Sequence, residues 1–319
     1  MKIQQLRYFV QVADKGSVRA AAESLGVSAA AVSQSLRELE RTVSAPLLTR
    51  ESQGATLTYI GRQLLTHARL ILGQIGRAED EIGQLRGLAG GVLSVGVTPW
   101  VSQSLLPLVL GQFHTLRPDV RLDIFEELGT AHSLLRDGTL DLVIGLPPPR
   151  HHASNFFSRD LFACGMAVIS RRGHPLAHCT SMAELTGQDW ILTLRQEELE
   201  QPLNDMLKPF GMVPAPNNIH LARSTLIALS MLDVGDMLTV CPWPLVESPL
   251  MRNRIQAFSV REALPDMTTS MVIRRNDTVS TTAQLFIDCF KEAIETAVQT
   301  DDPVMKRVMS AVEVFPFPD

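Results

Sequence analysis

Apolar residues recur every three or four positions in three short stretches at the start of the chain, which is the spacing of amphipathic helices. The first stretch closes at Gly16. The second begins at Ser17 as its N-cap and breaks at Gly26. The third runs from the capping Ser28 to about Glu40. Two short helices joined by a glycine-containing turn predict a helix-turn-helix, with a plain three-helix bundle as the alternative.

The third predicted helix has one apolar and one largely polar face. Val32, Leu36 and Leu39 fill the core, while small residues on the opposite face allow close approach to a major groove. Hydroxyl, amide and guanidinium groups there can bond base edges or phosphates. The candidate DNA contacts on this helix are Ser28, Ala29, Ala30, Ser33, Gln34 and Arg37.

A short hairpin is predicted after these helices. Residues 46–50 and 55–58 have the composition of two strands, and Gly54 lies in the turn between them. Such a hairpin forms the wing of a winged helix-turn-helix. Thr49 and Arg50 are candidate DNA contacts on it, and the guanidinium is suited to phosphate.

A longer apolar pattern begins at Ile60 and continues to about residue 88 in steps of four and three. It predicts a helix of roughly 40 Å at 1.5 Å per residue. Because a lone helix with an apolar stripe is poorly stable in water, pairing with the same helix of a second copy is expected. An intramolecular core helix is the alternative. The predicted seam comprises Ile60, Leu64, Ala68, Ile71, Ile75, Ala78, Ile82 and Leu85.

Short apolar runs alternate with helical patterns over the remaining two-thirds of the chain. Strands at 92–97, 120–125 and 140–145 are separated by helices, an order that predicts parallel pairing. We expect an α/β fold of two interleaved subdomains, with crossovers near Cys164 and Pro265. Further strands are predicted at 165–169, 190–193, 219–221, 237–240 and 271–273, and helices at 198–210, 224–234 and 281–296.

Charge is divided unevenly along the chain. Residues 1–77 hold ten Lys or Arg and five Asp or Glu, a net charge of +5, whereas the whole chain carries −5. A basic end on an acidic body suits a DNA-reading module joined to a part that does not bind DNA. No run of 18 apolar residues and no apolar signal core occur, so we expect a cytoplasmic protein without a membrane partner.

Reactive side chains do not form a recognisable catalytic or metal motif. No nucleophile elbow, P-loop, dinucleotide fingerprint or zinc-protease motif occurs, so no enzyme, catalytic residue or cofactor is expected. His174 and His178 are four apart, but Pro175 indicates a loop, and no metal site is predicted. Four scattered cysteines predict free, buried thiols, with a redox-sensing regulator as the alternative to a ligand-responsive one. They are Cys164, Cys179, Cys241 and Cys289.

The first sixty residues carry a dense set of motifs. They include Leu6-Arg7-Tyr8-Phe9-Val10, Gly16-Ser17, Ala20-Ala21-Ala22, Val27-Ser28, Leu39-Glu40, Pro46-Leu47-Leu48 and Leu57-Thr58-x-x-Gly61. This set resembles the N-terminal signature of the LysR-type transcriptional regulators. Two departures occur: Ala29-Ala30 stands where the family has Gln-Pro, and Gln34 stands where it often has Arg. These positions carry base readout, so we expect the readout to differ.

The segment from residue 92 to about 297 is similar to the effector domain of the same family, which resembles periplasmic solute-binding proteins. The similarity rests on Arg136-Asp137-Gly138-x-Leu140-Asp141, Arg172-Gly173-His174-Pro175-Leu176 and Val234-Gly235-Asp236. The resemblance implies binding to double-stranded promoter DNA, a homodimer through the linker helix, a homotetramer of such dimers, and a small-molecule effector. RNA polymerase is a further candidate partner.

These patterns divide the chain into four parts. Residues 1–59 form the winged helix-turn-helix and 60–89 the linker helix. Residues 90–302 form the effector-binding domain, and 303–319 are a tail without an assigned structure. Within the effector-binding domain, subdomain one comprises 90–163 and 266–302, and subdomain two comprises 164–265.

Several candidate effector contacts follow predicted strands and precede helices, where open α/β sheets bind ligands. Hydroxyls beside free helix N–H groups, together with an arginine, suit an organic anion such as a carboxylate or sulfonate. Each hydroxyl is equally suited to capping its helix. Trp100 could cover an apolar ring or lie in the core. The candidates are Thr98, Pro99, Trp100, Gly129, Thr130, Thr193, Arg223 and Ser224.

Overall fold

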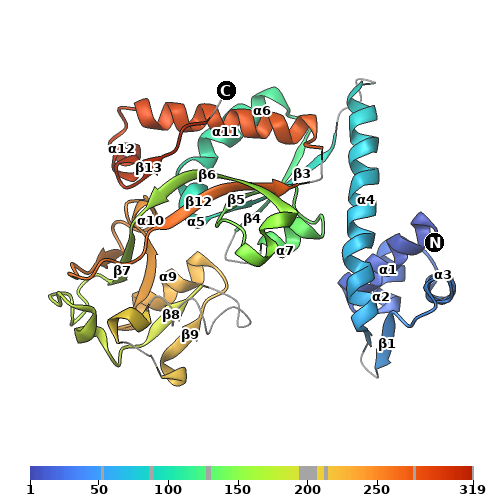
Figure 1. Cartoon of the computed structure of the whole chain (residues 1–319), viewed down its shortest axis with the longest axis horizontal. Helices are drawn as coiled ribbons and strands as arrows, with labels where there is room; N and C mark the ends of the chain where they lie inside the picture. Colours follow the sequence, from blue (N-terminus) through green and yellow to red (C-terminus); the bar gives the residue numbers. More distant parts are fainter. Residues whose placement is uncertain are drawn as a thin grey trace. The chain divides into compact units, whose positions relative to one another are not determined.

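A computed structural model describes residues 1–51, 54–85, 90–126, 131–193, 207–211, 215–275 and 278–317. The chain divides into two units (Figure 1). The first comprises Met1–Gly91 and Ser133–Leu140, and the second comprises Val92–His132 and Asp141–Asp319. Each is described by itself below. No helix within the described residues combines the length and apolar character needed to cross a membrane.

The first unit begins with three short helices, a hairpin and a long helix. Their bounds are α1 Ile3–Lys15, α2 Val18–Leu25, α3 Ala29–Val43, β1 Leu48–Glu51, β2 Gly54–Leu57 and α4 Tyr59–Leu85. Ser17 and Ser28 cap α2 and α3, each accepting a hydrogen bond from a backbone N–H of the first turn. Gly26 ends α2 at φ 66°, a left-handed conformation that suits glycine. The predicted winged helix-turn-helix is confirmed.

The core of this head is built from the faces predicted to be apolar. Phe9, Val12, Val32 and Leu39 are fully buried, and the small Ala21 lets the helices approach closely. β1 and β2 pair antiparallel, as the wing prediction requires.

The junction between wing and long helix depends on Gly61. A Cβ at this position would lie 2.0 Å from the carbonyl oxygen of Leu47, so a side chain cannot fit without moving the backbone. The Thr58 hydroxyl holds the same junction, since it donates to the carbonyl of Pro46 and accepts from the Gly61 N–H.

Helix α4 has two apolar faces rather than the single predicted seam. Ala68 is fully buried in the head core and Leu64 packs against that core. Ile71 and Ile82 are instead 38% and 55% exposed. The prediction that Leu64 and Ala68 belong to the outward stripe is therefore wrong, because their side of α4 is already covered within the chain. The exposed stripe contains Ile60, Ile71 and Ile82.

The second unit is built on two groups of strands. A six-stranded sheet has the order β13-β6-β12-β5-β3-β4, and a three-stranded sheet the order β10-β7-β11. A further pair consists of β8 and β9. The strands are β3 Val92–Val97, β4 Arg121–Glu126, β5 Leu142–Gly145, β6 Phe156–Cys164, β7 Met166–Arg171, β8 Trp190–Leu192, β9 Ile219–Leu221, β10 Thr239–Pro242, β11 Ile255–Ala257, β12 Met267–Arg274 and β13 Glu313–Val314.

The large sheet is mixed. β3 pairs parallel with both β4 and β5, as predicted from their alternation with helices. β12 pairs antiparallel with β5 and β6, and β13 pairs antiparallel with β6. The helices described by bounds in this part of the chain are α5 Pro99–Gln103, α6 Leu106–Leu116, α7 Ala131–Arg136, α9 Thr225–Val234, α10 Trp243–Val246, α11 Thr281–Gln299 and α12 Pro303–Ser310.

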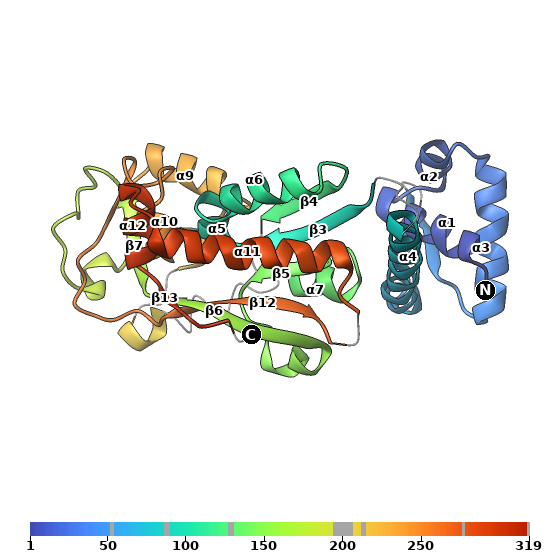
Figure 2. The ribbon, with the colours of Figure 1, turned by 90° about the horizontal axis from the view of Figure 1, so that it is seen from above.

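Helices α6 and α11 lie side by side over one face of the large sheet (Figure 2). Phe113 and Phe286 join them, with ring centroids 5.6 Å apart in an edge-to-face arrangement. The helix expected between the predicted strands 92–97 and 120–125 is divided into α5 and α6, because Pro107 lies in the first turn of α6 and lacks the N–H that a continuous helix needs. The helix predicted at 198–210 lies mostly outside the described residues.

The two predicted crossovers lie side by side. Cys164, the last residue of β6, pairs with Met267, the first residue of β12. Between them, residues 165–266 contain β7 to β11 and correspond closely to the predicted subdomain two, 164–265. The chain therefore enters and leaves subdomain two through adjacent strands, which is the arrangement of a hinge.

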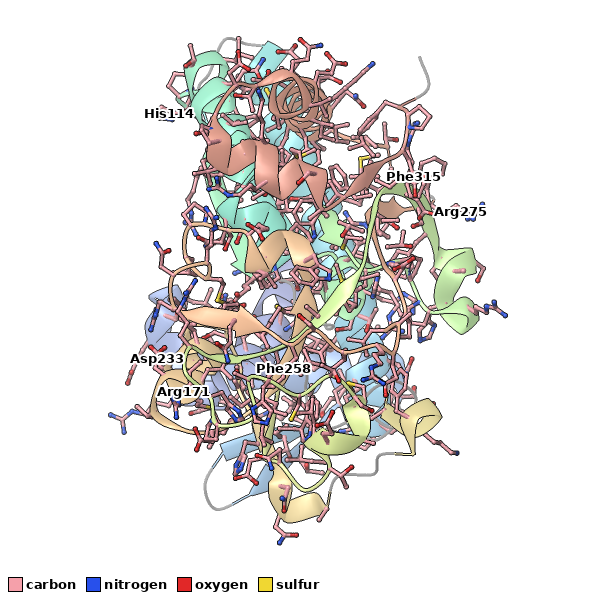
Figure 3. The ribbon with its side chains drawn as sticks, turned by 90° about the vertical axis from the view of Figure 1, so that its left-hand side faces the viewer. His114, Arg171, Asp233, Phe258, Arg275 and Phe315 are labelled. Carbon is pink, nitrogen blue, oxygen red and sulfur yellow. The ribbon has the colours of Figure 1, made fainter. Side chains whose placement is uncertain are left out.

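The described residues 303–317 are ordered, although the sequence patterns leave this tail unassigned. It forms α12 and then adds β13 to the outer edge of β6. The Phe315 N–H donates to the carbonyl of Leu161, and the Arg159 guanidinium lies 4.9 Å from the ring centroid of Phe317. Phe315 is labelled in Figure 3. Val308 is buried against the core. Residues 303–317 therefore belong to the second unit.

Candidate DNA-binding and effector sites

The outer face of α3 is open to solvent. Gln34 and Arg37 are exposed, Ser33 is half-buried, and the first turn presents small side chains. Gln34 donates to Glu38, and the Arg37 Nε donates to the carbonyl of Ser33 at 3.2 Å. The exposed residues at the start of the helix are Ser28, Ala29 and Ala30. The structure therefore brings the predicted contacts of α3 onto one accessible surface.

Glu40 connects α3 to the wing. Its Oε1 accepts hydrogen bonds from the backbone N–H groups of Leu47 at 2.8 Å and Leu48 at 3.3 Å. Sequence reasoning noted Glu40 only as part of a motif and missed this role. The sequence feature that could have indicated this role is an acidic residue in the last turns of a helix, shortly before an apolar strand whose N–H groups need acceptors.

The two wing candidates lie on β1. The Thr49 hydroxyl is 2.6 Å from that of Thr56 on the opposite strand, and the Thr49 side chain is exposed. Arg50 pairs through its backbone with Ala55, and its side chain lies outside the described part of the structure.

In the second unit, two of the predicted effector segments come together. Val97 at the end of β3 is in register with Glu126 at the end of β4. The carboxylate of Glu126 in turn accepts a hydrogen bond from the Thr225 N–H at the start of α9. Because Thr98 follows Val97 and Ser224 precedes Thr225, the β3 end and the α9 start border one region.

Thr98 has the most informative side chain in this region. It is only 4% exposed, and its Oγ1 finds no hydrogen-bond partner among the described residues. Its backbone N–H donates to the carbonyl of Ile144 at 2.9 Å, which fixes the residue at the strand end. Although Thr98 occupies the N-cap position of α5, its hydroxyl makes no capping bond within the described chain. A buried hydroxyl without a partner is costly, and a bound ligand could supply that partner.

Ser224 and Thr193 have different surroundings. The Ser224 Oγ accepts from the Ile227 N–H at 3.2 Å, so it caps α9. Thr193 is half-buried and follows Leu192, whose carbonyl accepts from the Ala222 N–H and so brings Thr193 close to the α9 start.

Arg223 is exposed next to the cap of α9, and Pro99 is half-buried in the first turn of α5. The other two candidates, Gly129 and Thr130, lie outside the described residues.

Trp100 is a core residue. It is fully buried, its indole N–H donates to the Thr269 hydroxyl at 3.2 Å, and its ring packs edge-to-face on Phe162 at 4.9 Å. Of the two roles considered for Trp100, the structure supports the core role. A side chain with no exposed surface and a satisfied donor offers a ligand nothing to stack on.

Glu126 is a residue of this region that sequence reasoning missed. Both of its carboxylate oxygens lie 3.3 Å from the Thr225 nitrogen. The available signal was an acidic residue at a strand end next to predicted anion contacts, where a resident carboxylate competes for the same donors.

A pocket of about 490 Å³ lies elsewhere in the second unit. It is lined by Ala163, Cys164, Gly165, Trp243, Asp266, Ser310, Ala311, Val312 and Glu313. None of the described effector candidates lines this pocket. Two carboxylates and no cationic side chain line it, so it is poorly suited to an organic anion.

The four cysteines are free and buried. Burial raises the pKa of each thiol, that of Cys164 to about 12, with a further contribution from the nearby Asp266 carboxylate. Because the thiolate is the form that reacts with oxidants, these surroundings favour structural cysteines over a redox sensor.

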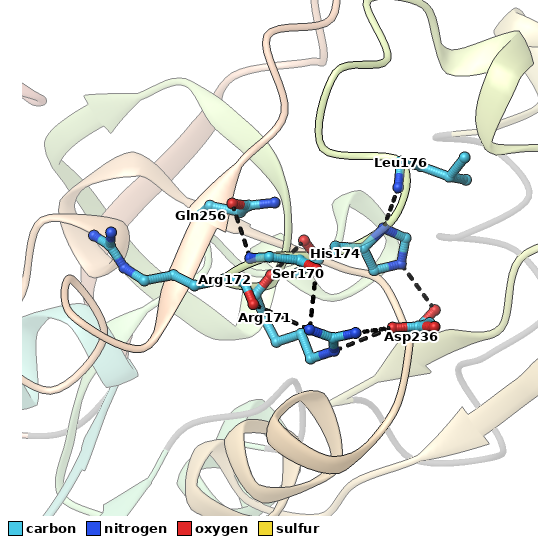
Figure 4. Close-up of polar contacts among 8 residues, drawn as sticks. Ser170, Arg171, Arg172, His174, Leu176, Asp236 and Gln256 are labelled. Atoms are coloured by element: carbon cyan, nitrogen blue, oxygen red, sulfur yellow. Dashed lines mark hydrogen bonds and ion pairs between the residues drawn. The ribbon is translucent and has the colours of Figure 1, made fainter.

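His174 has a structural role as well (Figure 4). Its Nδ1 accepts from the Leu176 N–H at 3.0 Å, and its Nε2 bonds the carbonyl of Asp236 at 3.1 Å. Arg171 joins the same group through two hydrogen bonds to the Asp236 carboxylate. Both ring nitrogens of His174 are thus engaged, and two of the noted motifs hold each other in place. Among the described residues, no cluster of three or more His, Cys, Asp or Glu is placed to hold a metal ion.

Comparison with known proteins gives consistent matches. Residues 3–62 match the sequence model of the bacterial regulatory helix-turn-helix protein, lysR family, and residues 86–295 match that of the LysR substrate binding domain. The HTH-type transcriptional regulator TdcA of Escherichia coli K12 is 24% identical over 292 residues, which is 91% of this chain and 93% of that protein. The uncharacterized HTH-type transcriptional regulator YdcI of the same organism is 34% identical over 178 residues, 55% of this chain and 58% of that protein.

A solved structure also matches over nearly the whole chain. Full-length CbnR in complex with its target DNA superposes with a TM-score of 0.59 at 21% identity, over 92% of this chain and 100% of that chain. At this identity the likeness concerns the fold. The order of head, long helix and two-subdomain body is therefore shared.

Proposed function

Since the chain belongs to the LysR family of bacterial transcriptional regulators, it binds DNA and carries an effector-binding domain, and we propose that its effector is a small organic anion. This family regulates transcription and is not enzymatic, so the prediction of a non-enzyme is confirmed. The proposed site lies at the carboxyl ends of β3 and β4, beside the start of α9.

The observation that carries this proposal is the buried hydroxyl of Thr98, which has no hydrogen-bond partner among the described residues. A ligand oxygen at this point would supply the missing hydrogen bond. The negative charge is supported by the start of α9, where the Thr225 N–H already bonds a carboxylate. Exposed Arg223 next to the helix cap provides a nearby cation. Thr193 and Pro99 are the remaining described candidates at this site.

In the head, we propose that α3 enters the major groove of promoter DNA and that the wing contacts phosphate. Support comes from the exposed face of α3 and from the bond between Glu40 and the wing, which fixes the two elements relative to each other. The proposed contacts are Ser28, Ala29, Ala30, Ser33, Gln34, Arg37, Thr49 and Arg50.

We also propose that the protein is a homodimer through α4 and a homotetramer of such dimers. Exposed Ile71 and Ile82, with half-buried Ile75, leave an apolar stripe on α4 that a second copy would cover. Effector binding across the hinge would bias the two subdomains toward one arrangement and so alter the spacing of the DNA heads. RNA polymerase is a further proposed partner.

A thermal-shift screen of the full-length protein tests the effector proposal. The library pairs each carboxylate or sulfonate with its neutral amide or alcohol analogue. A ligand of the folded state present at 100 times its Kd stabilises that state by about 2.7 kcal/mol. We expect anions, and not their neutral analogues, to raise the melting temperature, and we expect Thr98→Val to reduce this effect. If only the neutral analogues raise the melting temperature, the proposal that the effector is an anion is wrong.

A further inference from the structure

The start of α9 already holds a carboxylate from within the chain. The two oxygens of Glu126 each lie 3.3 Å from the Thr225 nitrogen, and Glu126 is 99 residues away in sequence. β4 belongs to subdomain one, whereas α9 lies in the segment between the two crossovers. This contact therefore links the two subdomains next to the proposed effector site.

The donors at this helix start are largely taken. The Ile227 N–H donates to the Ser224 hydroxyl and the Ala228 N–H to the Ser224 carbonyl, while the Thr225 N–H donates to Glu126. A helix N-terminus attracts negative charge through its free N–H groups and its dipole. A second anion at this position would find the Thr225 N–H already bonded and would be repelled by the negative charge of Glu126.

A separate observation indicates that a ligand enters here. The hydroxyl of Thr98 is buried and has no partner within the part of the chain that the structure describes, and it lies one residue beyond Val97, which is in register with Glu126. The same region thus contains one hydroxyl without a partner among the described residues and one N–H whose partner is an exposed carboxylate.

We propose that Glu126 is a built-in competitor of the effector. This rests on the anionic effector proposed above. In the effector-free protein the Glu126 carboxylate occupies the start of α9. The effector displaces it, bonds the Thr225 N–H and the Thr98 hydroxyl, and thereby breaks the link between β4 and α9. The apparent affinity is lowered by the fraction of molecules in which Glu126 occupies the donor, which sets the effector concentration at which the regulator responds.

The test uses Glu126→Gln, which keeps the size of the side chain and removes its charge. Because Glu126 is exposed, the variant is expected to fold, and thermal melting verifies this. Glu295→Gln on the exposed face of α11 is the control with the same change in net charge. The probe is acetate, titrated into the full-length protein at constant ionic strength with chloride as the balancing anion.

The readout is amide hydrogen exchange of the peptide covering the start of α9. Without acetate, we expect Glu126→Gln to exchange about three- to tenfold faster there than the unmodified protein or the control. With acetate, protection of this peptide should appear at about three- to tenfold lower concentration in Glu126→Gln.

Two results would overturn the proposal in distinguishable ways. If acetate protects α9 at the same concentration in all three proteins, the site binds anions but Glu126 does not compete. If acetate protects α9 in none of them, the proposed location of the effector site fails, and the competition fails with it.

Discussion

Replacing Thr98 with valine should stabilise the protein and weaken effector binding at the same time. Threonine and valine have nearly the same shape, so the substitution removes the hydroxyl with little change in packing. In the effector-free protein this hydroxyl is buried and lacks a partner among the described residues. Removing the hydroxyl should therefore stabilise the effector-free protein and remove a hydrogen bond to the effector from the bound protein.

The expected magnitudes follow from the cost of an unpaired polar group. A buried hydroxyl without a partner destabilises the folded protein by about 1–3 kcal/mol. If the lower value applies, Thr98→Val raises the free energy of unfolding by about 1 kcal/mol. For a domain of this size, that raises the melting temperature by about 2–4 °C. A hydrogen bond to a charged ligand contributes about 1.5–3 kcal/mol, so effector affinity should fall at least about tenfold.

Thr239→Val is the matched control, because Thr239 is also buried but its hydroxyl donates to the carbonyl of Ile191 at 2.7 Å. This variant should lose about 1 kcal/mol of stability and keep its effector affinity. Scanning calorimetry measures the melting temperatures, and titration calorimetry with a ligand from the screen measures affinity. If Thr98→Val melts lower, as the control does, the hydroxyl has a partner in the free protein. If effector affinity is unchanged, the proposed site is misplaced.

Four further predictions concern the head, the long helix and the C-terminal segment. Arg37→Ala should weaken DNA binding and, if the residue contacts phosphate, flatten the dependence of log K on log salt by about one unit, measured by fluorescence anisotropy. Gly61→Ala should destabilise the head by about 1–3 kcal/mol in thermal melting, because its Cβ would collide with a backbone carbonyl. Ile71→Glu combined with Ile82→Glu should reduce the mass found by light scattering, since charges cannot be buried in an apolar seam. Ending the chain at Asp302 should lower the melting temperature by about 6–12 °C, because at least about 3 kcal/mol of apolar burial is lost.

Each of these has a control and a contrary result. Arg275→Ala lies in the effector domain and should leave DNA binding unchanged, and an unaltered salt dependence in Arg37→Ala would reject a phosphate contact. Gln63→Glu adds charge on α4 at an exposed polar position, and an unchanged mass for the double isoleucine variant would show that α4 does not hold the oligomer. If the shortened chain has the same melting temperature as the full-length chain, α12 and β13 contribute little to stability. Normal stability of Gly61→Ala would mean that the Leu47 carbonyl moves freely.

The head could be predicted almost entirely from local sequence signals. Serine caps, the left-handed Gly26 and the helical spacing of apolar residues each depend on neighbours within a few positions. Because these signals are local, they could not separate the two apolar faces of α4. Leu64 and Ala68 follow the same spacing as Ile71 and Ile82, and the sequence period does not indicate which side α1 covers.

The effector domain depends more on long-range pairing, and there the patterns predicted less. The parallel set β4-β3-β5 was predicted from its alternation with helices. The insertion of β12 between β5 and β6, and the addition of β13 at the edge, join strands far apart in the chain. At the candidate site, the position of Thr98 was predicted, but the partner of the Thr225 N–H was not, because Glu126 reaches it across 99 residues.

The place of β12 in the large sheet has a consequence for how the protein is made. β12 lies between β5 and β6, yet it is synthesised about a hundred residues after either of them starts. On the ribosome, the head and then the strands of subdomain two emerge before the first sheet has its central strand. Until residue 274 leaves the exit tunnel, the facing edges of β5 and β6 have unpaired backbone groups. The nascent chain is therefore most exposed to mispairing while subdomain two is being translated, and closure of the first sheet is a late, slow step.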